Sequence, residues 1–144
     1  VMSTDDFGFR ATPVKKSAPT GEAVHVYRDF ADLGDGLKAY AFVIRTSSLS
    51  ALSTGCSGGK NKVCSLVLEG GSSNAKAVDL ATGALISPAG TSQLRIDATD
   101  VAEPSGGSVP PDTYAVSISG MFSYSLGTSA SQLPITAGNV RVIS

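Results

Sequence analysis

The chain has 144 residues, and its 11 Lys and Arg against 12 Asp and Glu give a net charge of −1. Charged residues make up only 16%, compared with about 25% in an average domain, and no basic run is longer than Lys15-Lys16, so no nucleic-acid partner is expected. The length predicts one domain, and because no apolar stretch reaches the roughly 18 residues of a membrane-spanning helix, no direct membrane span is expected.

The first 22 residues carry no sustained hydrophobic period. Pro13 and Pro19 interrupt the segment, and Gly-containing stretches flank them, which predicts an extended N-terminal arm over residues 1–22. Phe7 and Phe9 are two positions apart, so in an extended chain both rings point the same way and need an apolar surface. We expect both rings to contact a neighbouring subunit.

Residues 23–144 are predicted to form a single β-sandwich domain. Residues 23–30 alternate, with Val24, Val26 and Phe30 on one face, whereas residues 37–46 are nearly all apolar, as a strand buried on both faces would be. Residues 31–36 (ADLGDG) have the composition of a turn, so the two strands are predicted to form a hairpin.

One short helix is the most that the sequence supports. Ser47 or Ser48 can cap a single helical turn through Leu49, Ala51 and Leu52, which Gly55 would end.

Short strands fill the rest of the chain. Gly-containing turns separate strands predicted over residues 63–69, 75–80, 84–87 and 93–99, and a last strand is predicted over 139–143. Seven or eight short strands with closely spaced turns predict an all-β fold, an antiparallel β-sandwich.

The clearest strand signal covers residues 113–126. Large apolar residues fall on one parity and Ser or Ala on the other, which predicts one long strand whose core face includes Val116, Ile118, Phe122 and Tyr124. Gly120 interrupts the apolar row, as a bulge or a close backbone approach would.

Cys56 and Cys64 are the only cysteines, and a polar, Gly-containing loop joins them. This spacing favours an intramolecular disulfide, which predicts a secreted or extracellular protein at a cell or virion surface. Two alternatives are buried free thiols in a reducing compartment and pairing between chains. One distant histidine cannot complete a zinc site, so no metal is expected.

Catalytic and cofactor signals are weak. Residues 55–59 (GCSGG) fit the G-x-S-x-G pattern, but the only histidine, His25, precedes them, whereas the nucleophile elbow needs a later histidine. Residues 55–60 are one residue short of a phosphate loop. His25 is predicted to be hydrogen-bonded or exposed to solvent, because Asp29 would lie about 13 Å along the strand. No enzyme activity and no cofactor are expected.

Two groups of acidic residues remain. Both have three-residue spacing, which differs from the alternate positions of a calcium loop, so turn formation is favoured over calcium binding. The groups are Asp29, Asp32 and Asp35, and Asp97, Asp100 and Glu103.

The expected function is that of a non-catalytic structural subunit of an extracellular assembly, a pilus-like filament or a surface coat. Its partners are predicted to be copies of itself or other subunits, joined through the N-terminal arm and open strand edges, because an added strand satisfies a row of backbone groups at once. Alternatives are a bacteriophage coat or capsid-decoration protein and a secreted binding module or adhesin.

Overall fold

The structure, a computed structural model, describes residues 5–59, 62–72, 75–86, 90–101 and 111–135. The all-β prediction is confirmed: these residues form eleven strands and no helix, hence no helix that could cross a membrane. The strands are β1 (Asp6–Thr12), β2 (Thr20–Asp32), β3 (Leu37–Thr46), β4 (Ser48–Ser57), β5 (Val63–Ser72), β6 (Lys76–Asp79), β7 (Leu85–Ile86), β8 (Ser92–Val101), β9 (Thr113–Gly120), β10 (Tyr124–Leu126) and β11 (Leu133–Pro134).

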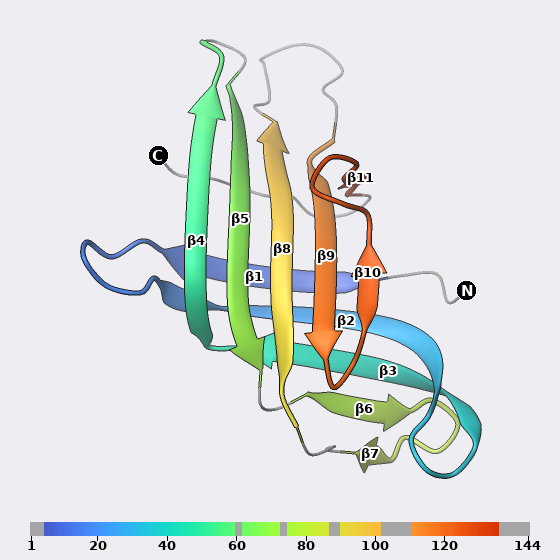
Figure 1. Ribbon diagram of the computed structural model, residues 1–144. Coiled ribbons are helices and arrows are strands. Elements are labelled where there is room, and N and C mark those ends of the chain that lie inside the picture. The colour runs from blue at the N-terminus through green and yellow to red at the C-terminus, as the bar shows by residue number, and fades with distance from the viewer. Residues whose placement is uncertain (1–4, 60–61, 73–74, 87–89, 102–110, 136–144) are drawn as a thin grey trace.

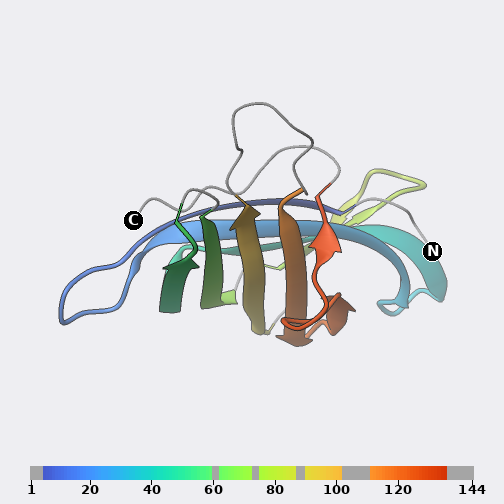
Figure 2. The same cartoon turned by 90° about the horizontal axis from the view of Figure 1, so that it is seen from above.

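The strands form two antiparallel sheets that pack face to face. Sheet A has the order β1-β2-β3-β6-β7, and sheet B has the order β10-β9-β8-β5-β4, with β11 also pairing with β9. Figure 1 shows the strands of sheet A running across those of sheet B, so this is a crossed sandwich rather than an aligned one. Seen from above, sheet A is the longer layer and extends past sheet B at both ends (Figure 2).

The hydrophobic core lies between the two sheets. Each strand contributes alternate residues to it, because successive side chains of a strand point to opposite faces. The central members of the core are Tyr27, Tyr40, Phe42 and Ile44 from sheet A and Leu68, Leu94, Ile96, Val116 and Ile118 from sheet B, each no more than 2% exposed.

A tight corner joins the sheets between β3 and β4, where Ser47 is the only intervening residue. Thr46 holds the corner: its buried hydroxyl donates to the Gly71 carbonyl at 2.5 Å and accepts from the Ser48 amide at 3.2 Å. Gly70 passes so close that a Cβ there would lie 2.9 Å from both the Ser48 carbonyl oxygen and the Thr46 hydroxyl. The crossing of the sheets therefore depends on a residue without a side chain at position 70.

The predicted hairpin at residues 31–36 is confirmed, since β2 and β3 pair from Ala23 opposite Thr46 to Asp32 opposite Leu37. The alternation of β2 is also confirmed, with Ala23, His25 and Tyr27 on the buried face. The four strands predicted between residues 63 and 99 correspond to β5, β6, β7 and β8. The strand predicted over 139–143 lies outside the described residues.

The predicted short helix is wrong. Residues 48–57 form β4, an edge strand that pairs with β5 and carries a register shift between Leu49 and Ala51. The shift places Leu49 opposite Gly70 and Leu52 opposite Leu68, so both leucines face the core although they are three residues apart. A bulged strand therefore gives the same spacing of apolar residues as a helical turn.

The prediction of one strand over residues 113–126 is also wrong. The segment folds back as the β9–β10 hairpin, in which Tyr124 pairs with Ile118. Gly120 ends β9 with φ of +102°, and a Cβ there would lie 2.6 Å from the Thr91 carbonyl oxygen. Phe122 is in the turn, only 8% exposed, with its ring centroid 4.8 Å from that of Phe42. The expectation that Phe122 is buried is confirmed, but not its place on a strand.

The N-terminal segment differs from the expected arm. Its residues 6–12 form β1, which pairs with β2 in unbroken register from Asp6 opposite Val26 to Thr12 opposite Thr20. The half-buried Phe7 and Phe9 pack against the core of their own chain. Any contact of these residues with a second subunit stays a prediction.

Candidate functional site

The most elaborate polar cluster surrounds His25 in β2, whose side chain is completely buried. Its Nδ1 lies 2.6 Å from the Tyr114 hydroxyl of β9, and its Nε2 lies 3.0 Å from Oδ2 of Asp5, just before β1. The Tyr124 hydroxyl of β10 donates to the same Asp5 oxygen at 2.5 Å. We call Asp5, His25, Tyr114 and Tyr124 the histidine clasp; it ties the start of β1 to both sheets.

The charge of Asp5 determines where the protons of the clasp lie. Burial alone would raise the pKa of Asp5, but the hydrogen bonds from His25 and Tyr124, together with the charges of His25 and Arg28, lower it overall. An ionised Asp5 only accepts hydrogen bonds, so Nε2 of His25 carries a proton and donates to it. When the ring is neutral, Nδ1 is then the acceptor for the Tyr114 hydroxyl; when the ring is charged, Nδ1 donates to the Tyr114 oxygen instead. Every polar atom of the ring has a partner.

Stacked aromatic rings enclose the clasp. Phe7 stacks on Tyr114 with ring centroids 3.8 Å apart, and Tyr27 stacks on Tyr124 at 3.9 Å. Burial raises the pKa of Tyr27, Tyr114 and Tyr124 above the usual tyrosine value, and the negative charge of Asp5 raises each of them further. The hydroxyls therefore remain protonated, and that of Tyr124 donates to Asp5.

The clasp contains the residue types of a proton relay, but its histidine is closed off from any molecule outside the protein. A general base must lie within hydrogen-bond distance of the proton that it removes. The ring of His25 is 0% exposed, and both nitrogens are already hydrogen-bonded within the protein. This arrangement fits the fastening of strands, and it confirms the expectation of a hydrogen-bonded histidine.

Sequence reasoning missed the partners of His25. It considered Asp29, which shares the strand, whereas the carboxylate that contacts the ring comes from Asp5, 20 positions earlier, and the hydroxyl comes from Tyr114, 89 positions later. No motif joins these residues. The one available signal was the parity of β2, which places His25 with Tyr27 on one face.

The predicted disulfide between Cys56 and Cys64 is present in the structure. The two residues are directly opposite each other in the β4–β5 hairpin, with Cα atoms 4.0 Å apart. The G-x-S-x-G stretch, residues 55–59, begins in the same edge strand and ends two residues after it. Ser57 is the last residue of β4 and is exposed. The next described element is the strand β5, whereas a nucleophile elbow needs a helix there.

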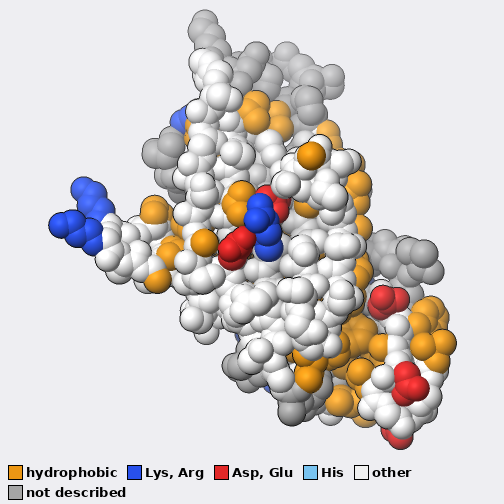
Figure 3. All heavy atoms as spheres, viewed as in Figure 1, with side chains coloured by type: hydrophobic (Ala, Val, Ile, Leu, Met, Phe, Trp, Pro, Cys, Tyr) orange, Lys and Arg blue, Asp and Glu red, His pale blue; other side chains and the backbone are white. Residues whose placement is uncertain are grey.

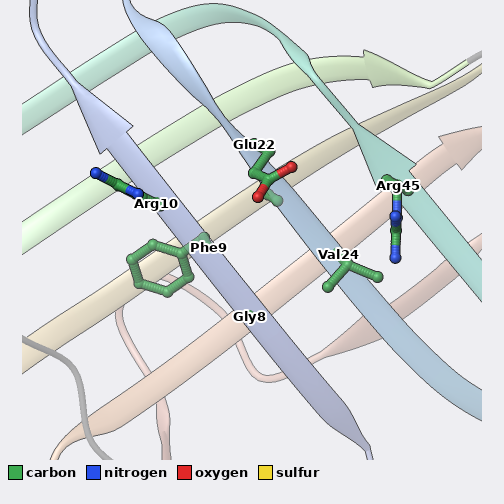
Figure 4. Close-up of a pocket in the computed structure, with 7 residues that line it drawn as sticks. Gly8, Phe9, Arg10, Glu22, Val24 and Arg45 are labelled. Atoms are coloured by element: carbon green, nitrogen blue, oxygen red, sulfur yellow. The ribbon is translucent and has the colours of Figure 1, made fainter.

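A shallow groove lies on the outer face of sheet A. Gly8 on β1 is opposite Val24 on β2, which is opposite Arg45 on β3, and the missing side chain at Gly8 leaves a hollow of about 280 Å³. Figure 4 shows Arg10, Glu22 and Arg45 around it, from three adjacent strands. The groove thus combines an apolar floor with two guanidinium groups and one carboxylate.

A second groove, which we call the apolar groove, lies where the β2–β3 hairpin extends past sheet B. Its volume is about 420 Å³. The β2–β3 hairpin lines one side with Ala31 and Leu33, and the β9–β10 hairpin lines the other with Met121 and Phe122. Asp29 and Asp32 are at its rim. It is therefore an apolar hollow with acidic edges.

The first acidic group forms a turn, as predicted. Oδ1 of Asp32 accepts from the Gly34 amide at 2.9 Å and from the Gly36 amide at 3.2 Å, and Asp35 lies 3.9 Å from Lys38. In the second group, Asp97 pairs with Arg95 at 3.0 Å, and Glu103 lies outside the described residues. Within the described residues, no three His, Cys, Asp or Glu side chains are grouped to hold a metal ion.

Comparison with family models, with curated proteins and with solved structures finds no match for this chain.

Proposed function

We propose that the protein is a non-catalytic structural subunit of an extracellular assembly, such as a pilus-like filament or a surface coat. The observation that carries this proposal is the open edge of β1. Its seven residues pair with β2 in unbroken register, and no described strand pairs with its other side. A long, regular edge presents unpaired backbone donors and acceptors, which are a template for another strand.

The other three sheet edges are protected in ways that the edge of β1 is not. β7 has two residues and β10 has three, and natural proteins shorten edge strands to prevent pairing. β4 is longer, but it carries a bulge. This contrast favours β1 as the strand whose backbone pairs with a neighbouring subunit. Phe7 and Phe9 at the same time anchor β1 to its own core.

The disulfide is compatible with an oxidising compartment outside the cytoplasm, because such bonds rarely persist where thiols are kept reduced. A bacteriophage coat or capsid-decoration protein uses the same kind of contact and is the first alternative. The outer groove with Arg10 and Arg45 favours the second alternative, a secreted binding module with an anionic ligand.

Negative-stain microscopy and sedimentation velocity on the natively purified chain separate these functions. Filaments support the pilus-like subunit, closed shells support the capsid alternative, and monodisperse particles at every concentration support the binding module. Replacement of Gly8, in the middle of β1, by Lys tests the edge itself, because Lys on an edge strand discourages pairing with another strand. If folded Gly8→Lys protein assembles like wild type, the edge of β1 is not the contact.

A further inference from the structure

The two ends of sheet A carry opposite charges. At one end, the β1–β2 loop projects beyond sheet B (Figure 2) and carries Lys15 and Lys16 at its tip. Both lysines are exposed, and no carboxylate of the described chain forms an ion pair with either. Val14, beside them, is 41% exposed. We call Val14, Lys15 and Lys16 the basic tip.

At the other end is the apolar groove. Asp29 and Asp32 lie at its rim, and Asp35 follows in the same hairpin with its side chain 86% exposed. Lys38 of the same hairpin lies 3.9 Å from Asp35. Figure 3 shows the basic atoms at the left-hand tip and the acidic atoms beside an apolar patch at the lower right.

Large apolar side chains are exposed in and beside the groove. Phe30 is 53% exposed and Met121 is 42% exposed, and both line it, while Leu37 next to the turn is 74% exposed. Contiguous apolar surface with a charged rim is typical of an interaction site. The volume of about 420 Å³ is large enough for a valine side chain with the lysine stems beside it.

We propose that the basic tip of one copy docks in the apolar groove of the next copy. Val14 enters the hollow, and Lys15 and Lys16 reach the carboxylates of Asp29 and Asp35. Because tip and groove are different surfaces at opposite ends of one sheet, the contact is head-to-tail, and repeated head-to-tail contacts form an open filament unless the rotation closes a ring. The inference rests on the proposed function and names the contact along the filament, whereas the edge of β1 provides a lateral one.

Charge reversal at each end provides the test. Lys15→Glu/Lys16→Glu makes the tip acidic, and Asp29→Lys/Asp35→Lys makes the groove basic; Asp32 is left in place because it caps the turn. Each variant alone brings like charges together, so its apparent dissociation constant for self-association should rise at least about tenfold. In an equimolar mixture, every tip meets a groove of opposite charge, and assembly should recover. Lys76→Glu, at an exposed position of β6, is the control for a change in net charge.

The readout is sedimentation velocity on the full chain, with the thermal midpoint of each variant measured to confirm folding. The docking is supported if the mixture assembles and neither variant assembles by itself. Raising the salt concentration from about 0.01 M to about 1 M, which shortens the Debye length from about 30 Å to about 3 Å, should weaken wild-type assembly. If both variants assemble like wild type, the docking is wrong but the structural-subunit function stands. If wild type is monomeric throughout, both are wrong.

Discussion

The ring of Phe7 lies on the ring of Tyr114, with centroids 3.8 Å apart and ring planes 12° apart. Phe7 belongs to β1 at the edge of sheet A, and Tyr114 belongs to β9 of sheet B. The stack thus joins the first strand to the opposite layer, next to the hydrogen bond between Tyr114 and His25.

Phe7→Ala should lower the free energy of unfolding by about 2–4 kcal/mol, because it removes a stacked, half-buried ring. Leu80→Ala, at an exposed position after β6, is the control and should change stability by less than about 0.5 kcal/mol. Urea titration measures both values. Equal, negligible losses would mean that β1 is not held on its own chain in solution.

Asp5→Asn should make the free energy of unfolding less dependent on pH under acidic conditions. The pKa of Asp5 is lowered in the folded protein, so its stabilisation is complete above the unfolded-state value near 3.9 and is lost as the pH falls through the folded-state value. The variant should also lose about 1–3 kcal/mol at pH 7, where a charged acceptor is replaced by a neutral one. Chemical denaturation at several pH values gives the profile. Asp6→Asn, at the exposed neighbouring position, should keep the wild-type profile.

Three tyrosines, two buried and one half-buried, should make the protein sensitive to alkali. Tyr27, Tyr114 and Tyr124 have pKa values raised in the folded state, so the stability present below the unfolded-state value near 10 is lost as the pH rises above it. Absorbance titration should show these three hydroxyls ionising only as the chain unfolds. Tyr124→Phe should reduce the slope of stability against pH by about one proton; an unchanged slope would show that Tyr124 ionises freely in the folded state.

Cys56→Ser/Cys64→Ser should cost about 2–3 kcal/mol, since the bond closes a short loop in the unfolded chain. The effect should be local, with faster amide exchange in the β4–β5 hairpin and little change around His25. Thiol titration of natively purified protein checks the compartment: two free thiols would contradict an oxidising location.

The fold class, the β2–β3 hairpin and the disulfide could be predicted because each depends on neighbouring residues in the chain. The errors arose where one pattern fits two structures. In β4, a bulge places Leu49 and Leu52 on the same face with helical spacing. In the β9–β10 hairpin, Ile118 and Tyr124 are directly opposite each other and point to the same face of the sheet. They are six residues apart, so they would also point to one face in a single continuous strand.

The histidine clasp could not be predicted for a different reason. Asp5, His25 and Tyr114 meet only because two sheets cross, and no local pattern in the sequence encodes that crossing. Burial of His25 also depends on which face of β2 meets sheet B, and alternation alone leaves the two faces equivalent.

β2 connects the β1–β2 loop at one end of sheet A to the β2–β3 turn at the other (Figure 1). Its 13 residues span roughly 40 Å at the usual rise of a strand. A pulling force applied between these two ends would therefore be carried by the covalent backbone of a single strand. Unlike a force that peels one strand from its neighbour, it would not open the hydrogen bonds of the sheet one after another, so the domain should resist tension along this axis far better than across it.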